Sequence, residues 1–531
     1  MINCCLNKTV GTLVTTLSIL IAQNASLVKA QGLSEPRTVF VHLFEWKWKD
    51  IAKECETHLG PQGYAAVQIS PPNEHAVINN NSNQVFPWWQ RYQPVSYSLE
   101  NSRSGTIAEL EDMITRCNAV GVDIYADAVI NHMIGGGEAT GSNGSRVTDK
   151  YDYPNVPYNR LDFHVDEADF PEFCNREIST EQNNNDYVDN PANAVRRCEL
   201  SGLADLNTTQ DNVRQTIANY LISLAELGVR GFRIDAAKHM NPEDIDNIIQ
   251  RVNDEISPDP YFFLEVIDPG GEAITAVDYF GVNNGEADIT EFKYGKKVGN
   301  KFLNSSYGDG SGREEKISEL RTLSPDWDLM NSTRAVIFTD NHDEQRKGEP
   351  YVTYKNGTLY DLINVFMLAW PYGYPKVMSS YEFSSFNQSP PSDSQGNTND
   401  IYVDGSDEPN CFNEWKCEHR WRPISNMVAF RNYTQPSFEV SNWWDNGGNQ
   451  IAFGRGDRGF VVINREDGPD LSRDFQTGLP EGNYCNIIEF DYDAAAETCT
   501  GETIEVDANG IANMSLKPFS AVAIHGGAKV P

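Results

Sequence analysis

Apolar residues along this chain fall into two recurring patterns, short continuous runs and stretches with helical spacing. The clearest helical stretch ends at Gly228, a typical helix C-cap, and a short apolar run begins at Gly231. Asn241 and Pro242 then open a second helix as an N-cap and a first-turn proline. A strand between two helices predicts one βα unit of a parallel sheet. The apolar face of the first helix is formed by Val213, Ile217, Leu221, Leu224 and Leu227.

Further apolar runs predict additional strands, and a helix over about residues 48–59 separates the first two. Strands that alternate with helices in a chain of this length favour an α/β fold, namely a (β/α)8 TIM barrel. The strand runs cover residues 38–44, 64–70, 122–130, 261–266, 335–339 and 376–378.

Two regions break this alternation. Residues 133–199 are rich in Gly, Asn, Asp, Tyr and Pro and are too long for a barrel loop, so we predict an inserted subdomain. From residue 433 to residue 531 the pattern changes to short strands with turns, which predicts a C-terminal antiparallel β domain. The barrel is then expected to occupy residues 31–132 and 200–432.

Charge and the first residues indicate where the protein acts. The chain has 531 residues and a net charge of −34, which argues against nucleic acid and anionic membranes as partners. Residues 1–30 are typical of a secretory signal, with an apolar segment over residues 10–22 and a small-residue cleavage pattern at Val28–Ala30. That segment is too short for a membrane anchor. We therefore expect a secreted, extracellular protein, with a monomer as the default.

An even number of cysteines remains once Cys4 and Cys5 of the expected signal are set aside. Eight cysteines in an exported chain favour disulfide bonds, and their spacing matches no zinc-binding pattern. Proximity in the sequence suggests three pairs, which leaves a fourth. The pairs are Cys174 with Cys198, Cys411 with Cys417, Cys485 with Cys499, and Cys55 with Cys117.

Polar residues collect where four of the predicted strands end. Arg233 and Asp235 lie two positions apart and project to the same side of their strand. The carboxyl ends of barrel strands carry the chemistry of this fold, so four such clusters predict an active site. A single Arg-x-Asp is also consistent with a structural ion pair. The clusters are Asp127 with Asn131 and His132; Arg233 with Asp235; Glu265; and Asn341 with His342 and Asp343.

A metal hydrolase is the alternative for three carboxylates with histidines, but the first strand has no His-x-His and no bridging lysine is present. The stretch FPWWQRYQP after the second strand favours a sugar instead. Its Trp88, Trp89 and Tyr92 offer aromatic faces, which suit sugar rings. A single tryptophan belongs more often to a core, but a Trp-Trp pair beside prolines favours a platform on a loop.

These motifs resemble the alpha-amylase family of glycoside hydrolases, most closely its chloride-dependent animal-type branch and the bacterial relatives of that branch. The resemblance runs from about Thr38 to Ile524 and is carried by DAVINH, GFRIDAAKH, LEV and FTDNHD. It implies a (β/α)8 barrel, a calcium-binding domain inserted after the third strand and a C-terminal Greek-key domain. It also implies a retaining endo-hydrolase of internal α-1,4-glucosidic bonds, acting on starch, glycogen and maltooligosaccharides.

By the same resemblance, three carboxylates have catalytic roles. Asp235 matches the nucleophile, Glu265 matches the acid/base, and Asp343 matches the third carboxylate, which binds substrate hydroxyls. The two reacting groups of a retaining enzyme should lie ~5 Å apart. The positive charge of Arg233 is expected to keep Asp235 ionised.

The resemblance also implies a set of substrate-binding residues on both sides of the cleavage point. Lys238 and His239 match the leaving-group side; for Lys238 the alternative is a solvated lysine at a helix start. The full set is Trp88, Trp89, Tyr92, Gln93, His132, Arg233, Lys238, His239 and His342.

Two ions are implied as well. A structural calcium ion would take side-chain oxygens from Asn131 and Asp205 and backbone carbonyls from Arg196 and His239.

Chloride, an allosteric activator in this branch, would be held by Arg233, Asn341 and Lys376, and an anion beside Glu265 would favour its protonated form. Animal enzymes usually have arginine at the third position, so lysine predicts weaker chloride binding. Lys376 could instead be only structural.

One segment departs from the family pattern. Relatives follow the NHD motif with a glycine-rich loop that contains a histidine, whereas this chain has the shorter, charged stretch 344–350 without one. The product pattern is therefore open, and an exo-acting or transglycosylating enzyme of the same family is the main rival. A non-catalytic starch-binding relative would normally lack one of the three carboxylates, and all three are present.

Overall fold

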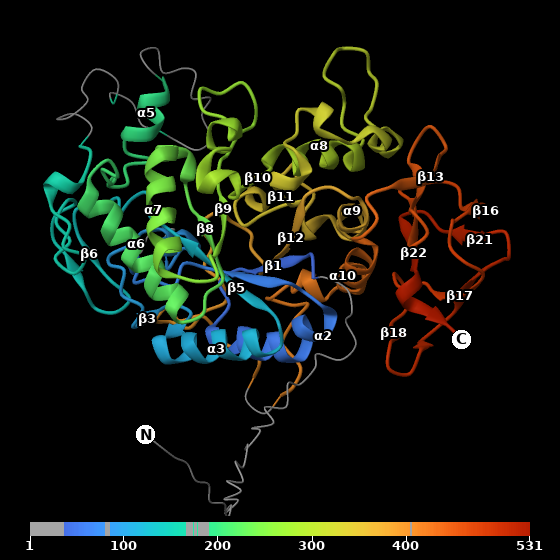
Figure 1. Cartoon of the computed structure of the whole chain (residues 1–531), viewed down its shortest axis with the longest axis horizontal. Coiled ribbons are helices and arrows are strands. Elements are labelled where there is room, and N and C mark those ends of the chain that lie inside the picture. Colours follow the sequence, from blue (N-terminus) through green and yellow to red (C-terminus); the bar gives the residue numbers. More distant parts are fainter. Residues whose placement is uncertain (1–36, 80–84, 166–173, 175–177, 179–190, 404–405) are drawn as a thin grey trace, which may run out of the picture.

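Eight parallel strands close into a barrel in this computed structural model, which describes residues 37–79, 85–165, 174, 178, 191–403 and 406–531 (Figure 1). The expected signal lies outside the described residues. The order around the barrel is β1-β12-β11-β10-β9-β8-β5-β2, which confirms the predicted fold class. The strands are β1 (Phe40–Leu43), β2 (Ala66–Ile69), β5 (Asp123–Ala128), β8 (Gly231–Ile234), β9 (Tyr261–Leu264), β10 (Asp288–Thr290), β11 (Ala335–Ile337) and β12 (Tyr374–Ser379).

Sequence patterns found every barrel strand except β10. That strand has only three residues, and two of them, Asp288 and Thr290, are polar. A strand this short, with polar residues at both ends, has no apolar run that would distinguish it from a loop in the sequence. The other strands have apolar side chains on both faces because helices cover the outside and side chains fill the inside. One inner layer consists of Phe40, Ala66, Tyr125, Phe263 and Val336.

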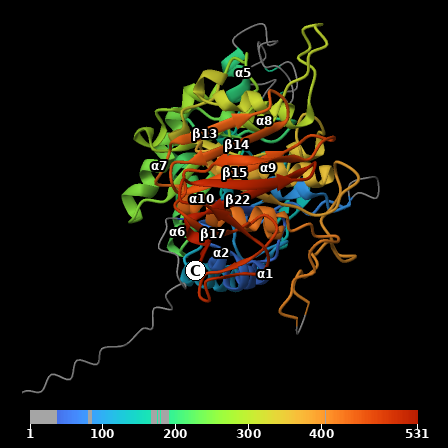
Figure 2. The ribbon, with the colours of Figure 1, turned by 90° about the vertical axis from the view of Figure 1, so that its right-hand side faces the viewer.

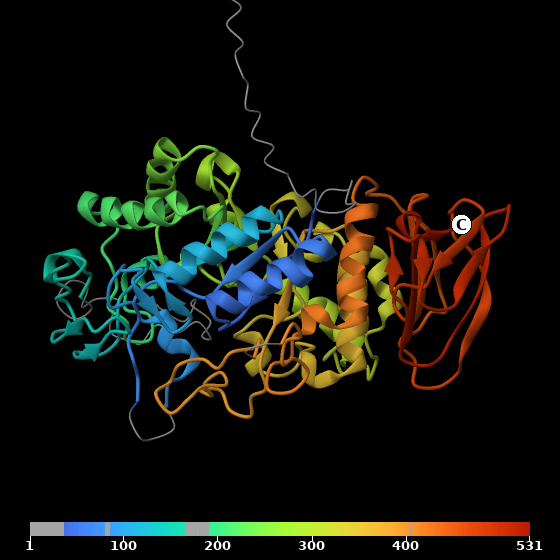
Figure 3. The ribbon, with the colours of Figure 1, turned by 90° about the horizontal axis from the view of Figure 1, so that it is seen from below.

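Helices surround the barrel (Figure 3). The predicted helix over residues 48–59 is α1 (Trp48–Glu54) followed by a π-helical turn, Cys55–Leu59. The predicted apolar face of α6 (Asp211–Glu226) is buried except for the partly buried Leu227 at its end, and Gly228 follows with a φ of 106° that favours glycine. The others are α2 (Gly60–Gln62), α3 (Ile107–Ala119), α7 (Pro242–Glu255), α8 (Phe292–Leu303), α9 (Thr358–Ala369) and α10 (Arg422–Thr434).

The segment after β5 leaves the barrel and is tied back to it. It contains β6 (Ala139–Thr140), β7 (Arg146–Val147) and α5 (Pro191–Arg197). The Met133 amide donates to Ala204 O at 2.9 Å, so both ends of the segment meet at the barrel. Between β2 and α3, a small hairpin pairs β3 (Asn101–Ser102) with β4 (Gly105–Thr106). The predicted domain boundaries stay predictions.

Antiparallel strands form the C-terminal part, which lies at one end of the molecule (Figure 1) and faces the viewer in Figure 2. Its four-stranded sheet packs on α9 and α10, with the Phe366 and Phe453 rings 6.0 Å apart. The strands are β13 (Val440–Asp445), β14 (Gln450–Arg455), β15 (Gly459–Asn464), β16 (Leu471–Gln476), β17 (Gly482–Cys485), β18 (Tyr492–Asp493), β19 (Thr498–Cys499), β20 (Thr503–Val506), β21 (Ile511–Leu516), β22 (Ser520–His525) and β23 (Lys529–Val530).

All four predicted disulfide bonds are confirmed. They join Cys55 to Cys117, Cys174 to Cys198, Cys411 to Cys417 and Cys485 to Cys499. Within the described part of the chain, none of the helices has the length and apolar character needed to span a bilayer.

Candidate active site

Arg233 occupies the centre of the carboxyl end of the barrel, where its guanidinium donates to three carboxylates. Its Nη1 lies 2.5 Å from Asp127 Oδ1 and 2.8 Å from Asp235 Oδ1, and its Nη2 donates to Glu265. All four side chains are buried. The sequence patterns predicted that these residues meet in one site but assigned Asp127 no role; the available signal was an acid inside the otherwise apolar run 124–130.

Strand register brings these residues together. β5 and β8 pair in parallel with Asp127 opposite Arg233. The ladder continues past the ends of β8 and β9, since the amides of Asp235 and Glu265 donate to carbonyls at the ends of the neighbouring strands. The four side chains therefore enter the mouth of the barrel at neighbouring positions.

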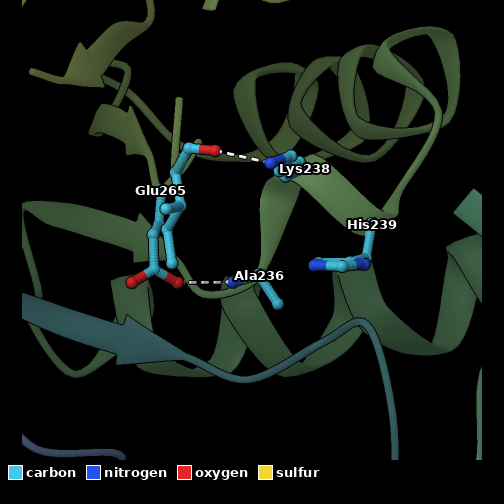
Figure 4. Close-up of a pocket in the computed structure, with 5 residues that line it drawn as sticks. Ala236, Lys238, His239 and Glu265 are labelled. Carbon is cyan, nitrogen blue, oxygen red and sulfur yellow. Dashed lines mark hydrogen bonds between the residues drawn. The ribbon is translucent and has the colours of Figure 1, made fainter. Parts of the chain in front are cut away.

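A tight turn directly after Asp235 connects this acid to Glu265. Ala236 has a positive φ of 49°, a conformation that costs roughly 1–3 kcal/mol for a residue with a side chain and is common at functional sites. Its amide donates to Glu265 Oε2 at 2.9 Å (Figure 4). The turn that follows Asp235 thus fixes the position of the Glu265 carboxylate.

Three buried carboxylates share one guanidinium, and the pKa values of Asp235 and Asp127 reflect this imbalance. Burial raises the pKa of Asp235 well above its usual range, Glu265 adds to the rise, and Arg233 opposes it. Burial also raises the pKa of Asp127. Arg233 acts in the expected direction, because it favours the ionised form of Asp235, but one positive charge does not offset burial and the neighbouring acids. These two coupled acids therefore hold a proton more readily than ordinary carboxyl groups.

Asp343 lies beside this cluster and is more open to the cleft. Its side chain keeps 27% of its surface exposed and lies 3.6 Å from His342 Nε2. Burial and the negative charge of Glu265 raise the pKa of Asp343 to about 6. Asn341 positions this acid, because its Oδ1 accepts from the amides of Asp343 and Glu344 at 2.9 and 2.7 Å. The cleft thus contains an acid that ionises near neutral pH.

Aromatic rings form one wall of the cleft. Tyr92 and His342 stack with ring centroids 5.3 Å apart and planes 5° apart, and Tyr92 OH donates to Asp127 at 3.0 Å. Trp88 is buried edge-on to both rings. Burial lowers the pKa of His342 well below its usual range, so this ring is neutral and suited to hydrogen bonding.

A distant segment of the chain supports the two tryptophans. Trp88 Nε1 donates to Phe386 O at 2.8 Å, and Trp89 Nε1 donates to Asn387 Oδ1 at 2.9 Å. Phe386 is 47% exposed, and its ring meets Trp88 edge-on at 5.9 Å. Phe386, which the sequence patterns did not single out, thus lies beside the Trp-Trp pair, and a platform for sugar rings at this place stays a prediction.

A small pocket opens on the other side of the acids. It is lined by Ala236, Lys238, His239, Glu265 and Ile267 (Figure 4). Lys238 Nζ donates to Ile267 O at 2.6 Å and pairs with Glu272. Because Lys238 is only 3% exposed, the alternative of a solvated lysine is wrong. His239 Nδ1 donates to Val195 O at 2.9 Å, and burial lowers its pKa to about 3.

His132 and Gln93 connect the aromatic wall to the segment after β5. His132 Nε2 donates to Tyr92 O at 3.0 Å, and Gln93 Oε1 accepts from the Gly135 amide at 3.3 Å. Burial lowers the pKa of His132 to about 4, so it is neutral. A direct contact of either side chain with a substrate stays a prediction.

Known proteins match almost the whole of this chain. The family model for the alpha-amylase catalytic domain matches residues 80–401, and that for the alpha-amylase C-terminal all-beta domain matches residues 441–527. The chain belongs to the alpha-amylase family. Its activity is that of an alpha-amylase, a glycoside hydrolase.

Similar alpha-amylases come from distant animals. That of Pecten maximus is 44% identical over 97% of this chain and 98% of its own length, and that of Tribolium castaneum is 46% identical over 93% and 95%. Alpha-amylase I of Eisenia fetida, solved as wild type and as a variant with maltohexaose, superimposes with a TM-score of 0.80 at 38% identity over 92% of this chain and 98% of that one.

The residues of this alpha-amylase that were expected to bind calcium lie where the segment after β5 meets the barrel. The backbone of Asp205 pairs with His132, directly after Asn131. Helix α5, which carries Arg196, accepts a hydrogen bond from His239 through the preceding carbonyl. The fold thus brings the four chain segments close together.

Lys376, expected to bind chloride in this alpha-amylase, has few partners. Its Nζ donates to Gln68 Oε1 at 3.3 Å and lies 4.9 Å from the centre of the Phe338 ring; among the described residues it has no ion-pair partner. Burial, together with Arg233, lowers the pKa of Lys376 to about 7. Within the part of the chain that the structure describes, neither ring nitrogen of the buried His42 has a hydrogen-bond partner, and burial and the charge of Lys376 lower the pKa of this ring. The ammonium of Lys376 and the N–H of a neutral imidazole are donors of the kind that a small anion needs.

A second buried charged cluster lies on α1 and on the 3-10 helix that precedes α10. Its Glu54, His58 and His419 are the one trio among the described residues with the spacing of metal ligands. Glu54 accepts from Arg420 at 2.6 and 2.9 Å, from His419 at 2.8 Å and from Tyr402 OH at 2.6 Å. A guanidinium on both oxygens of the carboxylate repels a cation, so we assign this cluster as an ion-pair network.

Proposed function

We propose that this alpha-amylase cleaves internal α-1,4-glucosidic bonds of starch, glycogen and maltooligosaccharides with retention of configuration. The observation that carries the proposal is that Asp235 and Glu265 accept hydrogen bonds from the two terminal nitrogens of one guanidinium, beside a pocket. Retaining glycosidases need two carboxyl groups roughly 5–5.5 Å apart. A single guanidinium that bridges both groups keeps them close, and the maltohexaose in a similar structure supports a glucan substrate.

Asp235 attacks the anomeric carbon and forms the glycosyl-enzyme bond as the glycosidic bond breaks. Glu265 gives its proton to the departing oxygen, and then takes a proton from the water that hydrolyses the intermediate. The proton must therefore lie on Glu265 when substrate is bound. Arg233, in contact with both acids, stabilises the ionised Asp235 at that stage.

The remaining side chains hold the glucan on both sides of this point. Asp343, the acid most open to the cleft, binds hydroxyls of the distorted sugar. Tyr92 stacks on that sugar, and the neutral His132 and His342 offer hydrogen bonds. Beyond it, Trp88 with Trp89 and the adjacent Gln93 line the subsites on one side, and Lys238 with His239 line the leaving-group side.

Calcium is proposed as a structural ion. The oxygens of Asn131 and Asp205 and the carbonyls of Arg196 and His239 are hard ligands of the kind that calcium prefers. Bound there, the ion would link the end of β5, α5 and the turn after Asp235. A chelator should therefore lower the Tm and the activity together, and added calcium should restore both; an unchanged Tm would contradict the assignment.

Chloride is proposed as an activator held by Arg233, Asn341 and Lys376. The isolated ammonium of Lys376 and the unsatisfied imidazole of His42 support this. An anion at this place competes with Glu265 for the guanidinium and thereby favours the protonated acid. The same lysine gives a single contact instead of a forked one, so we expect weaker activation than with arginine.

Secretion is also proposed, from the signal pattern of residues 1–30, and the protein is expected to act as a monomer. The N-terminus of the protein recovered from the medium of expressing cells tests the first point. A mature chain that still begins before residue 30 would contradict the predicted cleavage.

Product analysis on soluble starch, with and without chloride after exhaustive dialysis, tests the function. We expect a fast fall in viscosity and short α-anomeric maltooligosaccharides, with a higher rate when chloride is added. Activity that does not respond to chloride would support the proposed hydrolase but contradict the proposed anion site. Cyclic or lengthened products would mean that the altered stretch 344–350 has changed the reaction to transglycosylation.

A further inference from the structure

We propose that Arg346 is a positioning residue, which fixes His342 and Asp343 for the reaction. Arg346 is the last residue of the 3-10 helix Glu344–Arg346, which begins directly after Asp343. The inference rests on the roles proposed above for His342 and Asp343. It adds a residue to which the resemblance to the family assigned no role.

The guanidinium of Arg346 connects the backbone at His342 to a separate loop. Its Nη1 donates to His342 O, and its Nη2 donates to Tyr381 OH at 2.9 Å. Tyr381 OH in turn donates to Gln388 O at 2.7 Å. One planar side chain thus joins the strand end that carries the third carboxylate to the loop that supports Trp88 and Trp89.

Aromatic faces, and no acid, surround this cation. Its central carbon lies 4.3 Å from the ring centre of Phe383, 5.0 Å from that of Trp88, 5.4 Å from that of Tyr381 and 5.5 Å from that of Phe44. Within the described part of the chain, no carboxylate forms an ion pair with it. Cation–π contacts of this kind contribute roughly 0.5–2 kcal/mol and require the cation to face the ring. The position of Arg346 is therefore set by geometry and not by charge neutralisation.

Two of these rings, Tyr381 and Phe44, belong to a column of rings that ends at Tyr92. Tyr381 stacks on Phe44 at 5.9 Å with planes 9° apart, Phe44 stacks on His342 at 5.1 Å, and His342 stacks on Tyr92 at 5.3 Å. Arg346 contacts the far end of this column through Tyr381 and its middle through His342 O. A shift of the guanidinium would therefore move the two rings proposed to bind the reacting sugar.

Small displacements of such groups are costly, because a misplacement of about 1 Å can reduce the rate about 10²-fold. Loss of the clamp should act on the transition state, where the sugar is distorted against Tyr92 and His342, more than on binding of the ground state. We therefore expect kcat to fall while KM changes little.

The test compares Arg346→Met and Arg346→Lys in the full-length enzyme. We expect Arg346→Met to lower kcat by 10- to 100-fold with KM within about threefold of the wild type. Arg346→Lys keeps a cation over the rings and one donor, and should recover a part of kcat. Arg431→Met is the matched control: this buried arginine also donates to backbone carbonyls, those of Trp370, Tyr372 and Gly373, but lies on α10. It should lower the Tm and leave kcat per folded molecule unchanged.

A double-mutant cycle separates this proposal from the proposed function. In a His342→Ala background the effect of Arg346→Met should shrink, because the part of the effect that acts through the His342 ring is already lost. A folded Arg346→Met enzyme with wild-type kcat, or with raised KM and unchanged kcat, would overturn the proposal, as would full additivity in the cycle. An active Asp343→Asn enzyme would overturn the proposed roles of the site instead, whatever Arg346→Met does.

Discussion

Two clusters of buried charge in this alpha-amylase have opposite balances. Around Arg233, three carboxylates compete for one guanidinium, and burial raises the pKa of Asp235. Around Glu54, a single carboxylate receives a guanidinium, an imidazole and a phenol. There burial also favours the neutral acid, but His419 and Arg420 outweigh it and hold the pKa of Glu54 well below its usual range.

The difference shows what separates a structural network from a reactive site. Both carboxylate oxygens of Glu54 accept hydrogen bonds from these donors, so the ionised form is the stable one and no proton is exchanged near neutral pH. In the Arg233 cluster, burial and neighbouring acids instead raise the pKa values of Asp235 and Asp127, and raised pKa values in coupled acids are typical of a site that exchanges protons. Burial is similar in the two places, so charge balance, not burial, identifies the reactive site.

The largest effect is expected from Asp235→Asn. Removal of the proposed nucleophile should lower kcat by about 10⁴-fold or more. Because burial raises the pKa of Asp235 in the folded chain, its ionised form destabilises the fold above the unfolded pKa, and the variant should melt at the same temperature as the wild type or higher. Starch hydrolysis and calorimetry measure the two. An active variant would contradict the nucleophile assignment, and a large fall in Tm would contradict the charge imbalance.

Glu54→Gln should give the opposite result. It leaves the half-buried Arg420 facing a neutral amide instead of a carboxylate, and we expect a loss of roughly 3–5 kcal/mol in the free energy of unfolding with kcat per folded molecule unchanged. The folded pKa of Glu54 lies below the unfolded value, so the wild-type advantage is complete above the unfolded pKa and is lost as the pH falls through the folded pKa. Denaturant titrations at neutral and acid pH check this. A fall in kcat without loss of stability would place Glu54 in the catalytic machinery.

Chloride activation should depend on pH because Lys376 is the one charged group of the expected anion site that titrates near neutrality. Its pKa is lowered to about 7, and anion binding needs the ammonium form. The chloride concentration for half-activation should therefore rise about tenfold per pH unit above that pKa. Lys376→Arg, which stays charged, should bind chloride more tightly and lose this dependence. An identical pH dependence in the variant would assign it to another group.

The polar residues at the strand ends could be predicted from the sequence, and the charge balance among them could not. Asp235, Glu265 and Asp343 were predictable because acids at strand ends are rare in an apolar pattern. The raised pKa of Asp235 was not predictable, because it depends on Asp127 and Glu265 approaching the same guanidinium through strand register. Phe386 and Arg346 were missed for a related reason: each contacts Trp88 from another part of the chain, and neither lies in a periodic pattern.

The smallest effect is expected at Phe386, the exposed and uncharged residue that forms the rim of the site. Phe386 is exposed beside Trp88, so Phe386→Ala removes a stacking face but leaves the acids unchanged. We expect a rise of about three- to tenfold in KM for long maltooligosaccharides, little change for short ones and an unchanged kcat, since a lost stacking contact is worth roughly 0.5–1.5 kcal/mol. Phe438→Ala, at a phenylalanine that is 66% exposed and lies next to β13, is the matched control and should change neither constant. If Phe386→Ala lowered kcat instead, the rim would take part in the chemistry, and charge imbalance alone would no longer distinguish the reactive site from the rest of the cleft.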